Sequence, residues 1–132
     1  MCVFCQIVSG ELPSYKVYED EGTIAFLDRS PVRPGHTLVL PKIHYANLEE
    51  ISEIELGALI VVVKKVGSLL KDKLGVEGYN VNFNNDPVAG QVVKHLHFHI
   101  IPRAEGDGLG LWPGHEYAPG EEDIIINKLT GL

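Results

Sequence analysis

The sequence predicts an α+β fold, in which a five-stranded antiparallel sheet packs against one long helix and a short helix lies near the C-terminus. Five short segments rich in β-forming residues and separated by turns predict the sheet. One longer segment, residues 52–73, repeats apolar residues every three to four positions, which predicts the long helix. The length of 132 residues suits a single domain spanning residues 1–132.

The first three predicted strands lie between residues 16 and 40. Segments 16–19 and 23–28 are split by Asp20-Glu21-Gly22, a turn cluster typical of a β-hairpin. Residues 30–35 form a loop, because two prolines and a glycine fix backbone angles and remove hydrogen-bond donors. This loop leads into the third predicted strand, 36–40.

The long helix is expected to begin after Ser52, since Ser52 and Glu55 match a capping box, and to end at Gly75. Beyond it, segments 78–83 and 92–101 predict the last two strands, with a polar loop over 84–91 between them. A segment rich in glycine and proline then leads to a short helix near 121–129. The apolar positions expected to face the core from the long helix are Ile54, Leu59, Val62, Val66, Leu69 and Leu70.

Composition narrows the class of protein. The chain has 11 Lys and Arg residues against 18 Asp and Glu, a net charge of −7, which argues against a general nucleic-acid binder. No apolar stretch approaches the ~20 residues that cross a bilayer, so no membrane association is expected. The first residues lack the pattern of an export signal, and we expect a cytoplasmic protein.

Three of the six histidines, His95, His97 and His99, alternate with apolar residues. On a strand, such residues project from one face, whereas Leu96, Phe98 and Ile100 project from the other face into the core. At ~3.3 Å per residue, the outer two histidines stand about 13 Å apart, too far for all three to share one metal comfortably. Use of the row as the ligands of a metalloenzyme stays open as an alternative.

A row of imidazoles suits phosphorus chemistry. Crowded rings disfavour one another's protonation, and a neutral imidazole is what a nucleophile requires near pH 7. Such a ring can attack a phosphoryl centre if nearby donors stabilise the charge on the phosphate oxygens. The loop over 86–92 could supply these donors, since Gly90 allows a main-chain amide to approach an oxyanion closely.

Residues 84–103 resemble the signature of the histidine triad (HIT) family, close to its bacterial Hit/Hint-like members. The similarity extends over nearly the whole chain, and further motifs occur in the family's order and spacing. These motifs are Phe4-x-x-Ile7, Gly10-Glu11-x-Pro13, Phe26-Leu27-Asp28 and Pro34-Gly35-His36-Thr37-Leu38-Val39. The resemblance implies a homodimeric hydrolase or transferase that binds purine nucleotides and attacks their α-phosphate through a covalent nucleotidyl-histidine intermediate.

The resemblance also implies a role for individual residues. His97 would be the nucleophile, with His36 and His99 beside the α-phosphate and His95 completing the histidine group. Asp28 would bind the ribose hydroxyls. The phosphate cradle would comprise Asn84, Gly90, and the main chain of Gln91 and Val92, and the base would lie among Val3, Phe4, Ile7, Phe26 and Leu38.

Cys2 and Cys5 form a C-x-x-C pair, which in the cytosol points to metal or redox chemistry, with free reduced thiols as the alternative. They resemble the zinc-binding cysteines of bacterial HIT proteins, whose other two ligands correspond to His44 and His95. The implied zinc is structural and closes a tetrahedral site, leaving His97 and His99 for phosphate. No catalytic metal is implied.

Two positions refine the expected reaction. Val92 stands where many eukaryotic relatives have a serine that can donate to the leaving group. His99 stands where the transferase branch of the family has glutamine, which favours hydrolysis. A nucleoside 5′-phosphoramidate is the expected substrate class, and the alternatives are a dinucleoside polyphosphate or a nucleotide-sensing role with residual catalysis.

Overall fold

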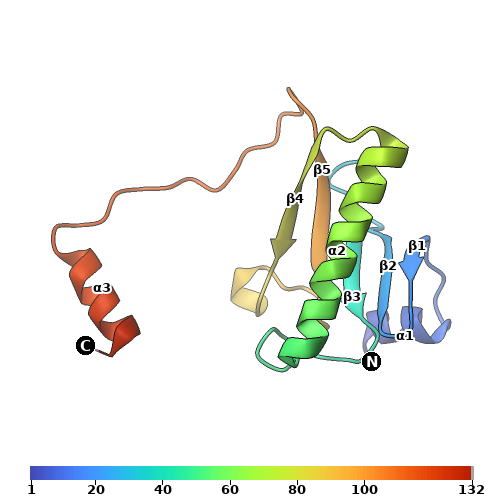
Figure 1. Ribbon diagram of the computed structural model, residues 1–132, viewed down its shortest axis with the longest axis horizontal. Coiled ribbons are helices and arrows are strands. Elements are labelled where there is room, and N and C mark those ends of the chain that lie inside the picture. Colours follow the sequence, from blue (N-terminus) through green and yellow to red (C-terminus); the bar gives the residue numbers. More distant parts are fainter. Residues whose placement is uncertain (132) are drawn as a thin grey trace.

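The computed structural model describes residues 1–131 and contains the expected five-stranded sheet, with strand order β1-β2-β3-β5-β4 (Figure 1). All neighbouring strands are antiparallel, and the predicted α+β class is confirmed. In chain order the elements are α1 (Val3–Ser9), β1 (Lys16–Glu19), β2 (Thr23–Leu27), β3 (Thr37–Pro41), α2 (Glu53–Leu74), β4 (Gly78–Phe83), the 3₁₀ helix η1 (Pro87–Ala89), β5 (Phe98–Arg103) and α3 (Glu121–Thr130).

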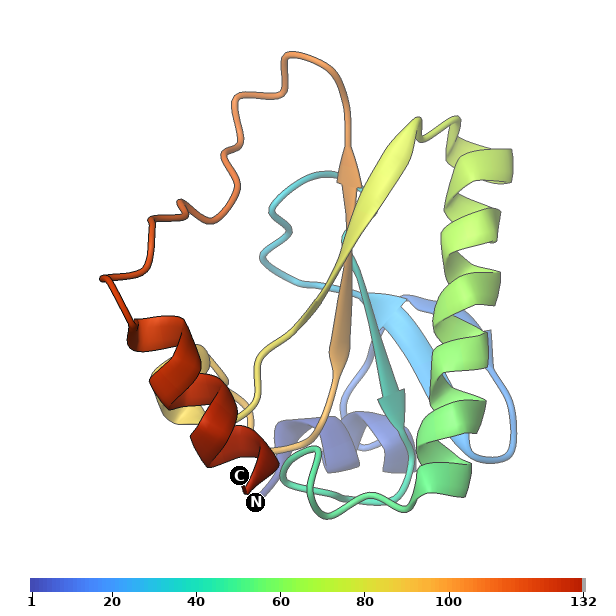
Figure 2. The same cartoon turned by 60° about the vertical axis from the view of Figure 1, so that its left-hand side comes forward.

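Helix α2 covers one face of the sheet (Figures 1 and 2). It begins after Ser52, whose hydroxyl accepts a hydrogen bond from the Glu55 amide at 3.1 Å, and it ends at Gly75, which is left-handed with φ 67°. Both predicted ends are therefore confirmed. Its buried apolar residues form one core with Ala25, Val39, Leu96 and Ile100.

Two positions predicted for the buried side of α2 are wrong. Ile54 is 87% exposed and Leu69 is 37% exposed. At 3.6 residues per turn, Ile54 lies about 140° around the helix from the fully buried Leu59, and Leu69 lies about 80° from it. The sheet contacts only the sector centred near Leu59, so spacing alone placed these two residues on the wrong side.

Helix α1 was not among the predicted elements, and it packs on the face of the sheet opposite α2. Side chains alternate along a strand, so Ile24 and Phe26 point away from the face that carries Ala25. Phe4 of α1 packs with these side chains and with Leu38 and Leu40 in a second apolar cluster. Because His99 is paired directly with Leu38, the His99 side chain lies on this α1 face.

The last strand starts later than predicted. The sequence predicts a strand over 92–101, whereas β5 begins at Phe98, so His95 and His97 precede the strand. The preceding segment bonds to loops instead: the Leu96 amide donates to the Tyr45 carbonyl at 2.7 Å. The Leu96 side chain is fully buried in the core that packs against α2.

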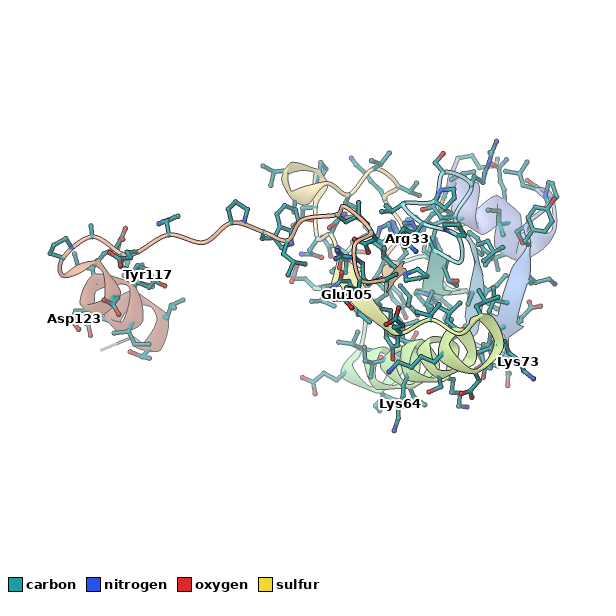
Figure 3. The ribbon with its side chains drawn as sticks, turned by 90° about the horizontal axis from the view of Figure 1, so that it is seen from above. Arg33, Lys64, Lys73, Glu105, Tyr117 and Asp123 are labelled. Carbon is teal, nitrogen blue, oxygen red and sulfur yellow. The ribbon has the colours of Figure 1, made fainter. Side chains whose placement is uncertain are left out.

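Residues 104–120, which we call the C-terminal strap, extend away from the rest of the chain and lead into α3 (Figures 1 and 3). Figure 3 shows Tyr117 and Asp123 far from Arg33, in the loop between β2 and β3, and from Lys64 of α2. Every residue of α3 is exposed. Within residues 1–131, no helix is long and apolar enough to cross a membrane.

Candidate active site

His97 is held by a single main-chain contact that decides which of its nitrogens is free. Nδ1 lies 2.7 Å from the carbonyl oxygen of His95, an acceptor, so Nδ1 carries the proton and donates it. In the neutral ring the lone pair is then on Nε2. His97 is 7% exposed, and its ring lies edge-on to Phe4 at 5.0 Å between centroids.

His36 and His99 form a hydrogen-bonded chain whose direction is also fixed. The Val32 amide donates to Nδ1 of His36 at 3.0 Å, so a neutral His36 carries its proton on Nε2. Nε2 of His36 lies 3.0 Å from Nδ1 of His99 and donates to it. His99 in turn carries its own proton on Nε2. The chain therefore ends in an N–H donor on His99, whose ring centroid is 4.9 Å from that of His97.

Burial keeps these rings neutral near pH 7. Desolvation lowers the pKa values of His36 and His97 below their ordinary value of 6.5. For His99, burial and the neighbouring His97 and His36 lower the pKa to about 4. The Asp28 carboxylate acts in the opposite direction on all three pKa values but does not outweigh desolvation.

Asp28 joins this group from the end of β2. Its Oδ2 atom is 3.6 Å from Nε2 of His36, and its Oδ1 atom accepts from the Ser30 amide at 2.8 Å. Asp28, His36 and His99 are close enough together to contact one metal ion. However, Nε2 of neutral His36 carries a proton, and a metal ligand needs a lone pair there. This arrangement favours a proton between the three side chains over a metal.

Residues 84–92, which we call the phosphate loop, lie between β4 and the histidines. The amides of Gly90 and Gln91 donate within the loop, to the carbonyls of Pro87 at 3.0 Å and Asp86 at 3.3 Å. The Val92 amide has no main-chain acceptor within residues 1–131. Asn84 reaches the loop through Nδ2, which donates to the Gly90 carbonyl at 3.4 Å. Of the three predicted main-chain donors, the Val92 amide is the one left free for a ligand.

The apolar residues predicted to hold the base come together beside the histidines. Phe4, Phe26 and Leu38 are buried in the α1 cluster, and Val3 and Ile7 pack against it with partial exposure. Val3 also lines a cavity of about 410 Å³ that it shares with Met1, Cys2, His44, Val92, Val93 and Lys94. Phe26 and Leu38 are 3% and 5% exposed, so they form the floor of any base site rather than its walls.

Cys2, Cys5, His44 and His95 also come together, as predicted, and their ligand atoms lie within 4.8 Å of one another. The Cys5 Sγ atom is 3.4 Å from Nδ1 of His44 and 3.6 Å from Nδ1 of His95. The Cys2 Sγ atom is 3.5 Å from the same His95 atom. Tetrahedral zinc with bonds of about 2.3 Å to sulfur and 2.0–2.1 Å to nitrogen separates these atoms by about 3.6 Å, so the residues fit zinc.

The orientation of His95 supports the same conclusion. Its Nε2 atom donates to the Pro41 carbonyl at 2.7 Å, which leaves the lone pair on Nδ1 facing the two thiols. His95 is fully buried, whereas His44 is exposed at the rim. Helix α1 supplies both thiols, because Cys2 caps the helix and accepts from the Cys5 amide at 3.4 Å. The predicted histidine row therefore splits, with His95 turned to the thiols and His97 and His99 left together.

Comparison with protein families decides the relationship. Residues 9–106 match the model of the HIT domain. The chain belongs to the histidine triad (HIT) family. The Protein hit of Bacillus subtilis is 45% identical over 133 residues, covering 98% of this chain and 92% of that protein. The adenosine 5′-monophosphoramidase hnt1 of Schizosaccharomyces pombe is 43% identical, covering 98% of this chain and 96% of that protein.

Solved HIT structures agree with the fold. The crystal structure of a HIT family member from Bacillus subtilis superposes with a TM-score of 0.88 at 42% identity, covering 98% of this chain and 95% of that chain. A Zn-bound histidine triad protein from Mycobacterium smegmatis superposes with a TM-score of 0.80 at 32% identity, covering 98% and 96%.

Sequence reasoning missed the groups that orient the histidines, because most of them are main-chain atoms. The Val32 amide and the carbonyls of Pro41 and His95 set the protonated nitrogen of three rings. Nothing in the residue type marks such a group.

Proposed function

We propose that this HIT protein is a nucleotide hydrolase that attacks the α-phosphate of purine nucleoside 5′-phosphoramidates and related conjugates through a nucleotidyl-histidine intermediate on His97. The observation that carries the proposal is the pairing of two fixed neutral rings. His97 is oriented with a free lone pair on Nε2, and the adjacent His99 presents an N–H on Nε2. The name of the fission-yeast relative, an adenosine 5′-monophosphoramidase, supports this substrate class.

The first step forms a bond between Nε2 of His97 and the α-phosphorus and breaks the bond from phosphorus to the leaving nitrogen. The leaving amine needs a proton, and the N–H of His99 is the available donor because Val92 has no hydroxyl. His36 can then return a proton to Nδ1 of His99 over 3.0 Å. In the second step water attacks the nucleotidyl-histidine, forming a P–O bond and breaking the bond from phosphorus to Nε2 of His97. The proton lost by the water returns to the His36–His99 pair, which restores its neutral rings, and the nucleoside monophosphate and neutral His97 are released.

The remaining predicted residues bind the nucleotide in this proposal. The Val92 amide and the Asn84 side chain bind the non-bridging oxygens of the α-phosphate, and Asp28 accepts hydrogen bonds from the ribose hydroxyls. Val3 and Ile7 contact the base over the floor formed by Phe4, Phe26 and Leu38. When bound, zinc would fix α1 to the sheet through Cys2, Cys5, His44 and His95 as a structural ion.

The decisive experiment is to trap the intermediate. Wild-type protein, His97→Ala and His115→Ala are mixed with adenosine 5′-phosphoramidate, quenched in base and analysed by peptide mass spectrometry. His115 is an exposed histidine of the C-terminal strap and serves as the matched control. An adenylyl group on His97 in the wild type and in His115→Ala, absent from His97→Ala, supports the proposal. Turnover without an adduct, or with equal rates in all three proteins, contradicts it.

We also propose that two copies form a homodimer across α2 and β4. Strand β4 is at the edge of the sheet, paired with β5 alone, and its Val81 is 42% exposed. Val61 of α2 is 50% exposed on the same side of the sheet. An edge strand with exposed apolar residues favours association with a second strand.

A further inference from the structure

The side chain of Gln91 is buried inside the phosphate loop and is only 5% exposed. Its carboxamide makes three main-chain hydrogen bonds. Oε1 accepts from the Asp86 amide at 2.8 Å, and Nε2 donates to the carbonyls of Ala46 at 2.6 Å and Val93 at 3.1 Å. A carboxamide offers an acceptor and two donors together, so neither Glu nor an apolar residue can satisfy all three partners.

One of these partners, Asp86, has an unfavourable backbone conformation. Its φ of 76° and ψ of 156° lie in a region that is essentially restricted to glycine. Asp86 is the one non-glycine residue with positive φ among residues 1–131. Such a conformation persists only where the surroundings impose it, and the Gln91 side chain is the acceptor for the Asp86 amide.

We propose that Gln91 is a positioning residue, which holds Asp86 in this conformation and thereby fixes the Val92 amide for the α-phosphate. The inference rests on the proposed function, because it assigns the Val92 amide to the phosphate. The Asp86 carbonyl accepts from the amides of Ala89 and Gln91, so the conformation of Asp86 orients the turn through Gly90. The Val93 bond then fixes the far side of Val92.

The three hydrogen bonds of the Gln91 carboxamide, which we call the Gln91 clamp, also join the phosphate loop to the segment before α2. The Ala46 carbonyl that accepts from Gln91 lies two residues after His44. Two further contacts join the same segments: the Leu48 amide donates to Asn85 Oδ1 at 2.8 Å, and Asn47 Nδ2 donates to Asp86 Oδ1 at 3.2 Å. Asn47 and Asn85 bond at the partly exposed rim of the loop, whereas Gln91 bonds from its interior.

The test compares the loss of kcat caused by Gln91→Leu in the wild-type background with the loss caused by the same substitution in an Asp86→Gly background. In the wild-type background, loss of the clamp lets Asp86 relax and moves the Val92 amide. We expect kcat for adenosine 5′-phosphoramidate to fall about tenfold to a hundredfold with little change in KM, because an amide that stabilises the transition state is displaced. Glycine adopts the loop conformation without strain, so in the Asp86→Gly background Gln91→Leu should lower kcat less than about threefold.

A purely structural role for Gln91 predicts a different result. If burial of Gln91 only stabilises the fold, Gln91→Leu changes the thermal midpoint by the same amount in both backgrounds and glycine at position 86 rescues nothing. Equal losses of kcat in the two backgrounds, or no loss in either, would overturn the inference. Gln91→Glu keeps an acceptor for the Asp86 amide but places a carboxylate oxygen against the carbonyls of Ala46 and Val93. The side chain cannot keep its position there, so this variant should behave like Gln91→Leu in the wild-type background.

A second readout keeps the inference separate from the proposed activity. The backbone order parameter of the Val92 amide, measured by ¹⁵N relaxation without any ligand, should fall from about 0.85 to below about 0.6 in Gln91→Leu and recover in the double variant. If wild-type protein has no phosphoramidase activity, the proposed function fails while this measurement still tests the clamp. An unchanged order parameter in Gln91→Leu contradicts the inference.

Discussion

Nδ1 of His97 donates a 2.7 Å hydrogen bond to the main-chain carbonyl of His95, and the His95 ring is itself directed at the thiols of Cys2 and Cys5. His95 thus orients the proposed nucleophile, His97, through its main-chain carbonyl, while its own ring is a candidate zinc ligand. Phe4 adds a second link, because it lies between the two cysteines in α1 and its ring contacts His97. The candidate zinc site and His97 are therefore linked through contacts of His95 and Phe4.

Replacement of a thiol should separate the structural effect of the metal from the chemistry. We expect elemental analysis to find one zinc ion per chain in the wild type and none in Cys5→Ser. At free zinc a hundred times the dissociation constant, the wild type gains about 2.7 kcal/mol of unfolding free energy that the variant lacks. The free energy of unfolding, measured with and without zinc, checks this value.

The activity of the metal-free protein completes that test. We expect chelation to lower the thermal midpoint and reduce turnover by much less than His97→Ala does, because the His97 lone pair does not depend on the ion. A chelator that abolishes turnover while circular dichroism shows an intact fold would contradict the assignment and make the zinc catalytic.

As the pH falls, the protein should begin to lose stability at a higher pH than protonation of its carboxylates alone would predict. Burial lowers the pKa of His99 to about 4, whereas the unfolded chain protonates near 6.5. Between these values the unfolded state binds more protons, so the free energy of unfolding rises with pH and falls as the pH drops from 6.5 toward 4. Urea midpoints measured from pH 7 to 4 check the direction, and His99→Asn should reduce the slope without removing it, because the pKa of His36 is also lowered by burial.

Burial also sets the acid limb of the activity. A His97 with the ordinary pKa would lose its attacking lone pair near pH 6.5, but burial lowers the pKa of His97 below that value. We expect kcat to be nearly constant from pH 7.5 to 6 and to fall at lower pH. A midpoint at 6.5 would show that the His97 ring is solvated in the working enzyme.

Sequence and structure agree where a local signal fixes the geometry. Ser52 with Glu55 and the left-handed Gly75 mark both ends of α2, and the Asp20 turn joins β1 to β2 through bonds from the Gly22 and Thr23 amides. These signals act within a few residues, so sequence alone suffices. The histidine trio and the thiol pair were also visible, because their residue types and spacing carry the chemistry.

The disagreements have a tertiary cause. Helix α1 is short and is stabilised by the contact of Phe4 with Phe26, 5.6 Å between ring centroids, which no local pattern reveals. The alternation over 92–101 is that of a strand, yet the bond from Leu96 to the Tyr45 carbonyl directs the first part of this segment elsewhere. Contacts between residues distant in the sequence therefore determine both the formation of α1 and the start of β5.

Packing between α2 and β4 depends on one missing side chain. A Cβ atom at Gly67 would lie 2.3 Å from Cζ of Tyr79, so the Tyr79 ring occupies the space that glycine leaves. Gly67→Ala must displace this ring and should lower the free energy of unfolding by about 1–3 kcal/mol. Gly57→Ala, in the same helix with no atom near its Cβ, is the matched control and should instead raise it by up to about 1 kcal/mol.

A double-mutant cycle tests the cause of that loss. In a Tyr79→Ala background the obstructing ring is absent, so Gly67→Ala should become neutral or stabilising through helix propensity. Chemical denaturation of the four proteins gives the coupling energy. If Gly67→Ala costs the same in both backgrounds, the helix and not the Tyr79 contact is responsible.

The proposed dimer gives the last prediction. A lysine at Val81, on the edge strand β4, would bring an ammonium group into the interface, where desolvation opposes association. We expect Val81→Lys to weaken the dimer at least about tenfold, which is ~1.4 kcal/mol, and to yield monomers by light scattering at micromolar concentration. Ile43 is 60% exposed and lies outside α2 and β4. Ile43→Lys adds the same charge, and this variant should keep the dimeric molar mass of the wild type. Because the exposed isoleucines of α3 offer another contact surface, a Val81→Lys protein that stays dimeric would place the association there, and deletion of residues 108–132 would then produce the monomer.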